Sequence, residues 1–248
     1  MADVAAVREI EERALKAWSA LRTVLVGGWE VRFAAGCTKR ANSANALEPS
    51  IPFDDVRREV EALYAAAGQP AIFRITPLAP PFADDALAGA GYRLIDPSIV
   101  MAADLPAFSA SSAVTIADTP TPAWLDGIAA ANNIAPPLRP VHDRIVQAIA
   151  TPAAFATLSV DGKPAGYGLA VCDRGRVGLF DVVVAATHRG RGFSRPLTET
   201  LLAWGRAHGA AAAYLQVGAG NGAALGLYHR LGFREAYRYH YRIRHFAI

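Results

Sequence analysis

The segment Gly178–Arg195, GLFDVVVAATHRGRGFSR, constrains this chain most, because an apolar run leads through a glycine- and arginine-rich turn toward a helix. The run Leu179–Ala185 is short and rich in valine, which is typical of a buried strand. An amphipathic helix is expected from Ser194 onward, because apolar side chains recur there at helical spacing, at Leu197, Leu201 and Trp204. The segment therefore predicts a strand, a tight turn and a helix in direct succession.

A turn of this composition favours a phosphate group as its ligand. Glycines allow backbone N–H groups to converge, and a helix N-terminus adds a partial positive charge. The first helical turn holds no carboxylate, and Arg189, Arg191 and Arg195 add formal positive charge. The segment lacks the Lys-Ser/Thr pair of a nucleotide P-loop and the third glycine of a dinucleotide turn. A phosphate-bearing ligand of another class is therefore expected.

The hexapeptide Arg189-Gly190-Arg191-Gly192-Phe193-Ser194 resembles the pyrophosphate turn of the GNAT superfamily of acyl-CoA N-acyltransferases, Gln/Arg-x-x-Gly-x-Gly/Ala. Its last position departs from that pattern, since Ser194 replaces Gly or Ala. Serine is also small, and it is a good helix N-cap.

A second stretch of the chain, Asn221–Phe233, resembles the same superfamily. There an Asn opens a short helix after the next strand, followed by Ala, Leu-Tyr and Gly-Phe, and this chain reads NGAALGLYHRLGF. The two motifs occur in the family's order and at about the family's separation. The resemblance covers residues 113–244.

The resemblance implies acetyl-CoA as co-substrate, direct attack by an amine, and no metal. It implies a tyrosine acid at Tyr228, which would protonate the departing thiolate, and a carboxylate base at Asp181. The runner-up base is His240, on the final strand. The residues expected to contact acetyl-CoA are Val182, Val183, Val184, Arg189, Gly190, Arg191, Gly192, Phe193, Ser194 and Asn221.

Each of these residues also has a purely structural interpretation. Tyr228 could be a core aromatic, Asn221 a plain helix cap, and Asp181 a strand-edge carboxylate that meets water. The arginines of the turn could be solvated, and His240 could belong to a packed aromatic ladder. Separately, Gly218–Ala223 fits G-x-G-x-x-A, the pattern of a dinucleotide turn, which would require further parallel strands.

One constant offset aligns the two halves of the chain without a gap. It places Val56 on Leu197 and Gly68 on Gly209, within a shared helix-strand-helix-strand order. The same offset places the glycine-arginine turn on 48–53, EPSIPF, which has an acid, two prolines and no glycine. The sequence thus predicts two tandem GNAT-like α/β (α+β) units, each a mixed, mostly antiparallel sheet flanked by helices. The expected domains are 1–106, degenerate, and 107–248, which would hold the acetyl-CoA site.

The remaining elements are less sharply marked. We expect strands over 24–34 and 38–47, helices over 121–131 and 140–150, and a hairpin centred on Asp161-Gly162. Cys37 and Cys172 match no metal or redox spacing and are expected to be free thiols.

Composition limits the classes of partner. Charged residues are 19% of the chain and the formal net charge is +3, without a basic block that would indicate nucleic acid. No apolar run reaches the ~18–20 residues of a membrane helix, and no export signal is evident, so a cytoplasmic protein is expected. The expected partner is the amine of a small molecule or peptide, with a homodimer left open. The rival hypothesis is a non-catalytic acyl-CoA-binding or regulatory protein.

Overall fold

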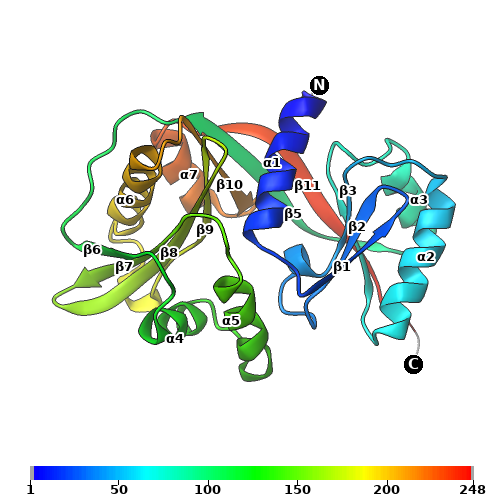
Figure 1. The fold of residues 1–248 in the computed structure, drawn as a ribbon, viewed down its shortest axis with the longest axis horizontal. Coiled ribbons are helices and arrows are strands. Elements are labelled where there is room, and N and C mark those ends of the chain that lie inside the picture. The colour runs from blue at the N-terminus through cyan, green and yellow to red at the C-terminus, as the bar shows by residue number, and fades with distance from the viewer. Residues whose placement is uncertain (1–2, 247–248) are drawn as a thin grey trace. The chain divides into compact units, whose positions relative to one another are not determined.

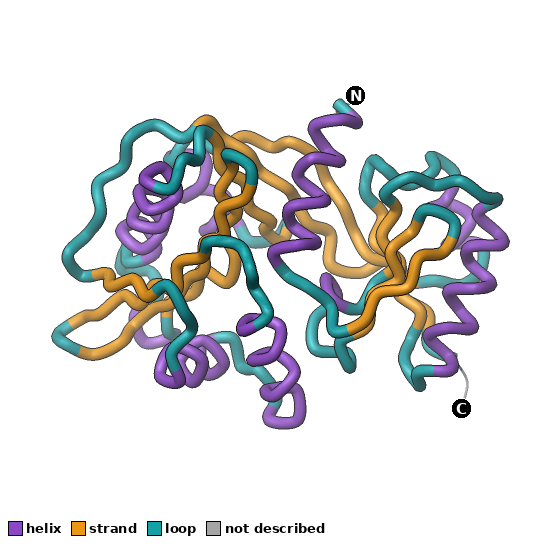
Figure 2. The backbone as a smooth tube through the Cα atoms, in the orientation of Figure 1, coloured by secondary structure: helices purple, strands orange, loops and turns teal. Residues whose placement is uncertain are grey.

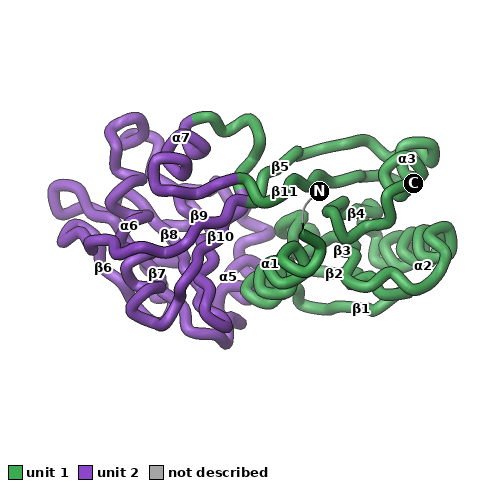
Figure 3. The backbone as a smooth tube through the Cα atoms, turned by 90° about the horizontal axis from the view of Figure 1, so that it is seen from above, with its two compact units in different colours: residues 1–100, 217–222, 235–248 green, residues 101–216, 223–234 purple. Residues whose placement is uncertain are grey.

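The computed structural model describes residues 3–246, and these form two compact units. Unit 1 contains the chain up to Val100, the short segment Val217–Gly222, and the residues from Glu235 onward; unit 2 contains Met101–Gln216 and Ala223–Arg234 (Figure 3). The units are therefore discontinuous in sequence, whereas contiguous domains, 1–106 and 107–248, are predicted from the sequence.

Unit 1 is a mixed sheet with helices beside it (Figure 1). Its strand order is β1-β2-β3-β4-β11-β5, in which β3 and β4 are parallel and the pairs β1·β2, β2·β3 and β4·β11 are antiparallel. The elements are α1 (Val4–Ala17), β1 (Arg22–Val26), β2 (Trp29–Phe33), η1 (Lys39–Ala41), β3 (Ala44–Ala46), α2 (Phe53–Ala66), β4 (Ala71–Ile75), α3 (Ala83–Gly89), β5 (Arg93–Asp104) and β11 (Arg234–Arg244).

The predicted strand over 24–34 is wrong, because the chain turns back within it. Gly27 and Gly28 have φ of 51° and 83°, and they join β1 to β2 as a hairpin. A Cβ on Gly28 would lie 1.7 Å from the Glu48 carbonyl oxygen, so this position requires glycine. The predicted strand over 38–47 is likewise mostly absent, since only β3 is extended there.

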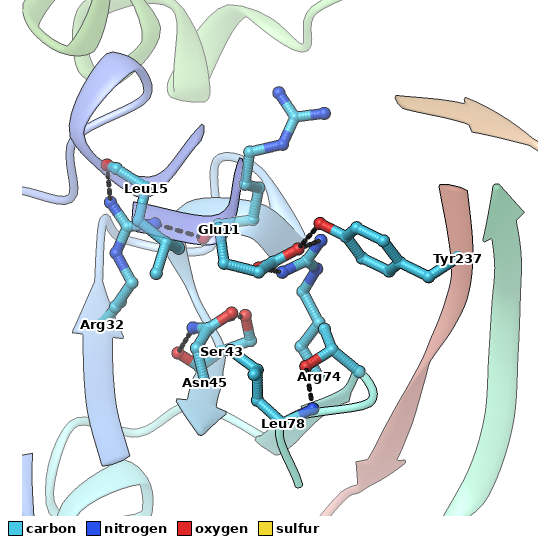
Figure 4. A network of polar contacts seen from close by, with 10 residues as sticks. Glu11, Leu15, Arg32, Ser43, Asn45, Arg74, Leu78 and Tyr237 are labelled. Atoms are coloured by element: carbon cyan, nitrogen blue, oxygen red, sulfur yellow. Dashed lines mark hydrogen bonds and ion pairs between the residues drawn. The ribbon is translucent and has the colours of Figure 1, made fainter. Parts of the chain in front are cut away.

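A buried ion pair joins α1 to the sheet of unit 1. Figure 4 shows the Glu11 carboxylate beside the Arg74 guanidinium, with the Tyr237 hydroxyl donating to the same carboxylate. The side chains of Arg74 and Glu11 are 1% and 2% exposed. Burial, followed by the adjacent carboxylate, raises the pKa of Tyr237, so its hydroxyl remains a donor. Two charges and a phenol are thus paired with one another where water is excluded.

The strands of unit 2 also form mixed sheet, with α6 on one face and α4 on the other (Figure 1). Its strand order is β5-β10-β9-β8-β7-β6, in which β9 and β10 are parallel and the pairs from β9 to β6 are antiparallel. The elements are β6 (Val114–Ala117), α4 (Pro122–Ala131), η2 (Pro136–Leu138), α5 (Arg139–Gln147), β7 (Ala153–Val160), β8 (Lys163–Asp173), β9 (Arg176–Val184), η3 (Ala186–His188), α6 (Ser194–Ala207), β10 (Ala212–Gly218) and α7 (Gly222–Arg230).

Figure 2 distinguishes the helices, in purple, from the strands, in orange. The predicted hairpin is present, because β7 and β8 pair through Asp161-Gly162, both with positive φ. The mixed α/β fold with a mostly antiparallel sheet, predicted from the sequence, is therefore confirmed. No helix within residues 3–246 combines the length and the apolar character needed to cross a membrane.

The offset that places Val56 on Leu197 coincides with the observed boundaries of secondary structure. It carries the first residue of α2, Phe53, onto that of α6, Ser194, and the last residue, Ala66, onto Ala207. The same offset carries the first residue of β4 onto that of β10, and the first residue of β5 onto that of β11. The last strand, β11, pairs with β4 of unit 1, and this pairing is why the C-terminal residues belong to unit 1.

Candidate functional site

Strand β9 carries a bulge at the residues that the sequence singles out. In its register with β8, Tyr167 lies opposite Val183 and Leu169 opposite Phe180, so Gly168 alone faces two residues, Asp181 and Val182. Asp181 has a φ of 48°, a left-handed conformation that Asp tolerates better than most residues with a Cβ. The strand is therefore extended by one residue at Asp181.

This extra residue changes the side of the sheet that Asp181 faces. Val177 lies under α6, because a Cβ on Gly205 would meet it, and Val182 lies near α6 residues beside Gly168. In a regular strand, Val177 and Val182 would face opposite sides of the sheet, because they are five residues apart. They share the α6 face only if the alternation shifts once between them. The bulge supplies this shift, and it turns Asp181 toward α5, whose His142 Nε2 lies 3.9 Å from Asp181 Oδ2.

The parallel pairing of β9 with β10 ends before the bulge. The paired register runs from Ala212 opposite Arg176 to Leu215 opposite Leu179, while β9 continues to Val184. Within this described part of the chain, the backbone groups of Asp181–Val184 on the β10 side are therefore not used by the ladder. The predicted contact residues Val182, Val183 and Val184 all lie in this stretch.

The glycine-arginine turn follows and leads into α6. Gly190 and Gly192 have φ of 74° and 81°, and a Cβ on either would meet nothing within 4 Å. Helix α6 begins at Ser194, and its N-cap is Phe193, which provides no side-chain hydrogen bond. The predicted start of the helix at Ser194 is therefore confirmed, although Phe193 and not Ser194 is the N-cap. The first turn also holds no acid, so its N–H groups meet no carboxylate or capping side chain there.

The arginines of the turn differ in what they contact. Arg189 Nε donates to the Val184 carbonyl oxygen at 3.0 Å, so this side chain braces the turn against the end of β9. Arg191 lies over the Phe193 ring, 5.1 Å from its centroid. Arg195 is 62% exposed and pairs with Glu199, one turn along α6, at 2.9 Å. Arg189 and Arg191 are thus the cations held closest to the turn.

Tyr228 lies on α7 in unit 2 and is almost fully buried. Its ring packs edge-on against Phe233, with centroids 5.8 Å apart. Burial raises the pKa of Tyr228 to about 12, so the hydroxyl keeps its proton at neutral pH and remains a donor. The Tyr228 ring can therefore pack in the core while its hydroxyl acts as a hydrogen-bond donor.

Asn221 lies directly before a short helix, as the sequence predicts. It belongs to unit 1, directly precedes α7, and donates its backbone N–H to the Gly218 carbonyl oxygen at 2.9 Å. The dinucleotide alternative at Gly218–Ala223 fails here, because none of these glycines has a positive φ and the next strand, β11, runs antiparallel to β4.

The runner-up base, His240, is held in unit 1 by an acid. Its Nε2 lies 2.6 Å from Asp84 Oδ1, and Arg242 contacts both oxygens of the same carboxylate, at 2.7 and 3.0 Å. The hydrogen bond from Arg242 is the largest cause that lowers the pKa of Asp84, to about 2. The three side chains fasten α3 to β11, so His240 has a structural partner.

This cluster makes the stability of unit 1 sensitive to acid. A carboxyl whose pKa is depressed contributes stability above its unfolded pKa of ~3.9 and loses it as pH falls through the folded value. The Asp84 side chain is 31% exposed, so solvent screening limits the effect. Between about pH 5 and pH 2, we expect wild type to lose on the order of 1 kcal/mol more than Asp84→Asn in urea unfolding. Parallel pH curves for the two proteins would contradict this.

One residue that sequence reasoning missed is His142. It occupies the buried face of α5 with Ile145 and Val146, at the i, i+3 and i+4 positions of an apolar stripe. A histidine within an apolar stripe predicts a polar contact inside the protein, because a buried polar ring needs a partner. This signal could have drawn attention to His142.

The residues of the turn fit the pyrophosphate of acetyl-CoA. A helix N-terminus without a side-chain cap or an acid in its first turn can accept an anion, and Arg189 and Arg191 supply positive charge beside it. Gly190 and Gly192 leave room for the close approach of a ligand to the backbone. Among residues 3–246, no group of three or more His, Cys, Asp or Glu is arranged to hold a metal ion.

Comparison with known proteins places this geometry in a family. A family model described as "Probable histone acetyltransferase Rv0428c C-terminal" matches residues 4–242. The chain is 29% identical over 244 residues to the uncharacterized N-acetyltransferase YobR of Bacillus subtilis (strain 168), a match that covers 96% of this chain and 98% of that protein.

Solved structures share the fold over nearly the whole chain. A GCN5-related N-acetyltransferase from Kribbella flavida has a TM-score of 0.72 at 17% identity, over 100% of this chain and 97% of that chain. A tandem GNAT protein from the clavulanic acid biosynthesis pathway has a TM-score of 0.59 at 13% identity, over 95% and 87%. The fold is that of the GCN5-related N-acetyltransferases, or GNAT proteins, and the chain belongs to the family of the Rv0428c C-terminal region.

Proposed function

We propose that this protein is an acetyl-CoA-dependent N-acetyltransferase that acts on the primary amine of a small molecule or peptide. The observation that carries the proposal is the start of α6, where two left-handed glycines precede a helix N-terminus with no capping side chain. This arrangement suits a pyrophosphate, and it directly follows the bulged end of β9.

The proposed contacts follow the order of the chain. The backbone of Val182, Val183 and Val184 would bind the pantetheine arm, and one of their N–H groups would stabilise the oxyanion. Residues 189–194 would bind the pyrophosphate. The acetyl thioester, when bound, supplies the acyl group for direct attack.

Asp181 is the proposed proton acceptor. A protonated amine is not a nucleophile, so its proton has to leave before the attack. Asp181 stands on the bulge immediately before the proposed pantetheine segment, and its side chain is 26% exposed. A half-buried carboxylate at this point can meet both the acceptor amine and solvent.

Tyr228 is the proposed acid that protonates the departing thiolate. We expect Tyr228→Phe to lower kcat about 100-fold while acetyl-CoA affinity stays within a few-fold, because the hydroxyl acts mainly as the thiolate leaves. The ring and its packing against Phe233 are kept in this variant, so stability should change little. The measurement is steady-state kinetics combined with equilibrium binding; wild-type kcat at every pH would remove Tyr228 from the mechanism.

We also propose a tandem arrangement, in which 1–106 derives from a GNAT-like unit that lost its cofactor site and 107–248 holds the site. The common offset of α2 from α6 and of β4 from β10 supports this proposal. The position equivalent to the start of α6 in unit 1 is the start of α2, which follows Pro52. Proline has no N–H to offer an anion, and α2 carries Asp54 and Asp55 in its first turn.

An acceptor screen tests the proposed function. Amino acids, polyamines, aminoglycosides and peptides are incubated with acetyl-CoA and the full chain, and CoA release is followed. A lysine peptide belongs in the panel, because the matching family description names a histone acetyltransferase. Release that requires both an amine and the protein supports the proposal. Tight acetyl-CoA binding without transfer to any amine would favour the non-catalytic rival.

A further inference from the structure

The imidazole of His142 lies between two carboxylates in unit 2. Its Nε2 is 3.9 Å from Asp181 Oδ2, and its Nδ1 is 3.4 Å from Asp143 Oδ1. The side chain of His142 is only 1% exposed, whereas those of Asp181 and Asp143 are 26% and 23% exposed. The three groups therefore form a path from the bulge of β9, through a buried ring, to a carboxylate that meets solvent.

Two features of the chain are needed to assemble this path. The bulge turns Asp181 toward α5, because strict alternation would place residue 181 on the α6 face with Val177. Helix α5 then presents His142 from its buried face. The strained φ of Asp181 accompanies this contact, and strain of this kind concentrates at functional positions.

We propose that His142 is a positioning residue for acetyl transfer, which takes up on Nε2 the proton that Asp181 has received and passes the proton of Nδ1 to Asp143. The proposal rests on the function proposed above. Asp181 alone touches the acceptor amine, and His142 acts through it.

The proton balance is simple. An N–H bond of the acceptor ammonium breaks, an O–H bond forms on Asp181, and the neutral amine attacks the thioester. The proton then moves to His142 Nε2, while the proton on Nδ1 moves to Asp143 and from there to water. The distance of 3.9 Å between His142 Nε2 and Asp181 Oδ2 exceeds a hydrogen bond, so the carboxylate has to turn toward the ring, or one water has to bridge the two groups.

Other charged groups of unit 2 hold the Asp143 carboxylate, where the proposed path reaches solvent. Arg139 Nε contacts both oxygens of Asp143, at 2.7 and 2.8 Å, and Arg139 Nη2 contacts Asp126 of α4 at 2.8 Å. These bonds raise the pKa of Arg139, so the guanidinium remains charged. It orients the Asp143 carboxylate and leaves that carboxylate partly open to solvent.

The test compares His142→Gln and Asp143→Asn with a matched control, His208→Gln. His208 is exposed at the end of α6, and it contacts Trp204 rather than the path. The probes are a short lysine peptide and spermidine, each with acetyl-CoA. The readouts are kcat, KM, acetyl-CoA affinity and the pH profile between about pH 5 and 8.

We expect His142→Gln to lower kcat about 10- to 100-fold, with acetyl-CoA affinity within about twofold of wild type. The rise of kcat with pH across this range should be present in wild type and in His208→Gln, and absent in His142→Gln. Asp143→Asn, which alters a partly exposed side chain, should lower kcat in the same direction and is the deciding variant if His142→Gln does not fold.

The outcomes separate the inference from the proposed function. Wild-type protein that transfers acetyl to neither probe nor any amine of the screen would remove the proposed function, and this inference with it. Wild-type activity with an unchanged kcat and pH profile in Asp143→Asn and in folded His142→Gln would overturn the inference alone. A lower kcat with a wild-type pH profile would give His142 only a structural role, which also contradicts the proposal.

Discussion

Gly192→Asp is expected to weaken acetyl-CoA binding at least about 100-fold. The new carboxylate would stand at the N-terminus of α6, where the pyrophosphate is proposed to bind, and two negative charges ~4 Å apart repel by roughly 4 kcal/mol near a protein surface. About 1.4 kcal/mol corresponds to a tenfold change in affinity, so a 100-fold loss requires less than the full repulsion. Isothermal titration calorimetry measures the effect.

Gly192→Asn is the matched control for this variant. Its side chain has nearly the same size, and both residues tolerate the left-handed φ of 81° better than others with a Cβ. A Cβ at this position meets nothing within 4 Å, so the two variants differ chiefly in charge. We expect Gly192→Asn to weaken binding tenfold or less; equal losses in both variants would mean that backbone strain, not charge, causes the effect.

Glu11→Ala is expected to destabilise unit 1 by about 3–5 kcal/mol, the cost of breaking a buried ion pair from one side. It leaves the Arg74 guanidinium, 1% exposed, as a buried charge without its carboxylate, and it removes the acceptor of the Tyr237 hydroxyl. The penalty is large because the remaining charge stays out of water. Urea unfolding followed by fluorescence measures the free energy, with Trp18 and Trp29 as probes within unit 1.

Two further variants isolate the cause. Glu12→Ala alters the next residue of α1, which is exposed, and should change the free energy of unfolding by less than about 1 kcal/mol. The double variant Glu11→Leu/Arg74→Met replaces both charges with apolar side chains and should recover much of the loss. If Glu11→Ala has a free energy of unfolding as high as that of Glu11→Leu/Arg74→Met, the buried charge of Arg74 is not the cause of the loss.

The glycine-arginine turn could be predicted from the sequence because its physics is local. Left-handed glycines, a helix start without an acid, and an apolar strand all lie within Gly178–Arg195. The boundaries of α6 follow from its apolar spacing and from Gly209, which has a φ of 84° just after the helix. Local chemistry of this kind is visible in one chain without knowledge of the fold.

The features that were missed depend on contacts between distant segments. In the hairpin at Gly27-Gly28, the Glu48 backbone packs directly against Gly28. The residues near Val24 give no indication of this contact. The partner of β11 is β4, which lies in the first third of the chain, so the discontinuous units could not be anticipated from local sequence patterns. The pairing of His240 with Asp84 is equally distant, and it gives a structural reason for a histidine that was considered as a base.

The bulge at Asp181 lies between these two cases. Asp181 is the one charge within the apolar run Leu179–Ala185, and the resemblance to the GNAT superfamily makes it a candidate base. Its direction depends on one unpaired residue opposite Gly168, which the alternation of apolar residues does not reveal. Along the chain, β7 and β8 separate α5 from β9. For this reason the sequence gives no sign that His142 lies close to Asp181.

Titration of acetyl-CoA into the full wild-type chain by calorimetry tests the central claim most directly. The account predicts saturable binding at one site per chain, because only α6 begins with the glycine-arginine turn, whereas α2 begins after a proline with acids in its first turn. Free CoA should compete for the same site, since it carries the same pyrophosphate. Absence of saturable binding, or two equivalent sites per chain, would contradict the account.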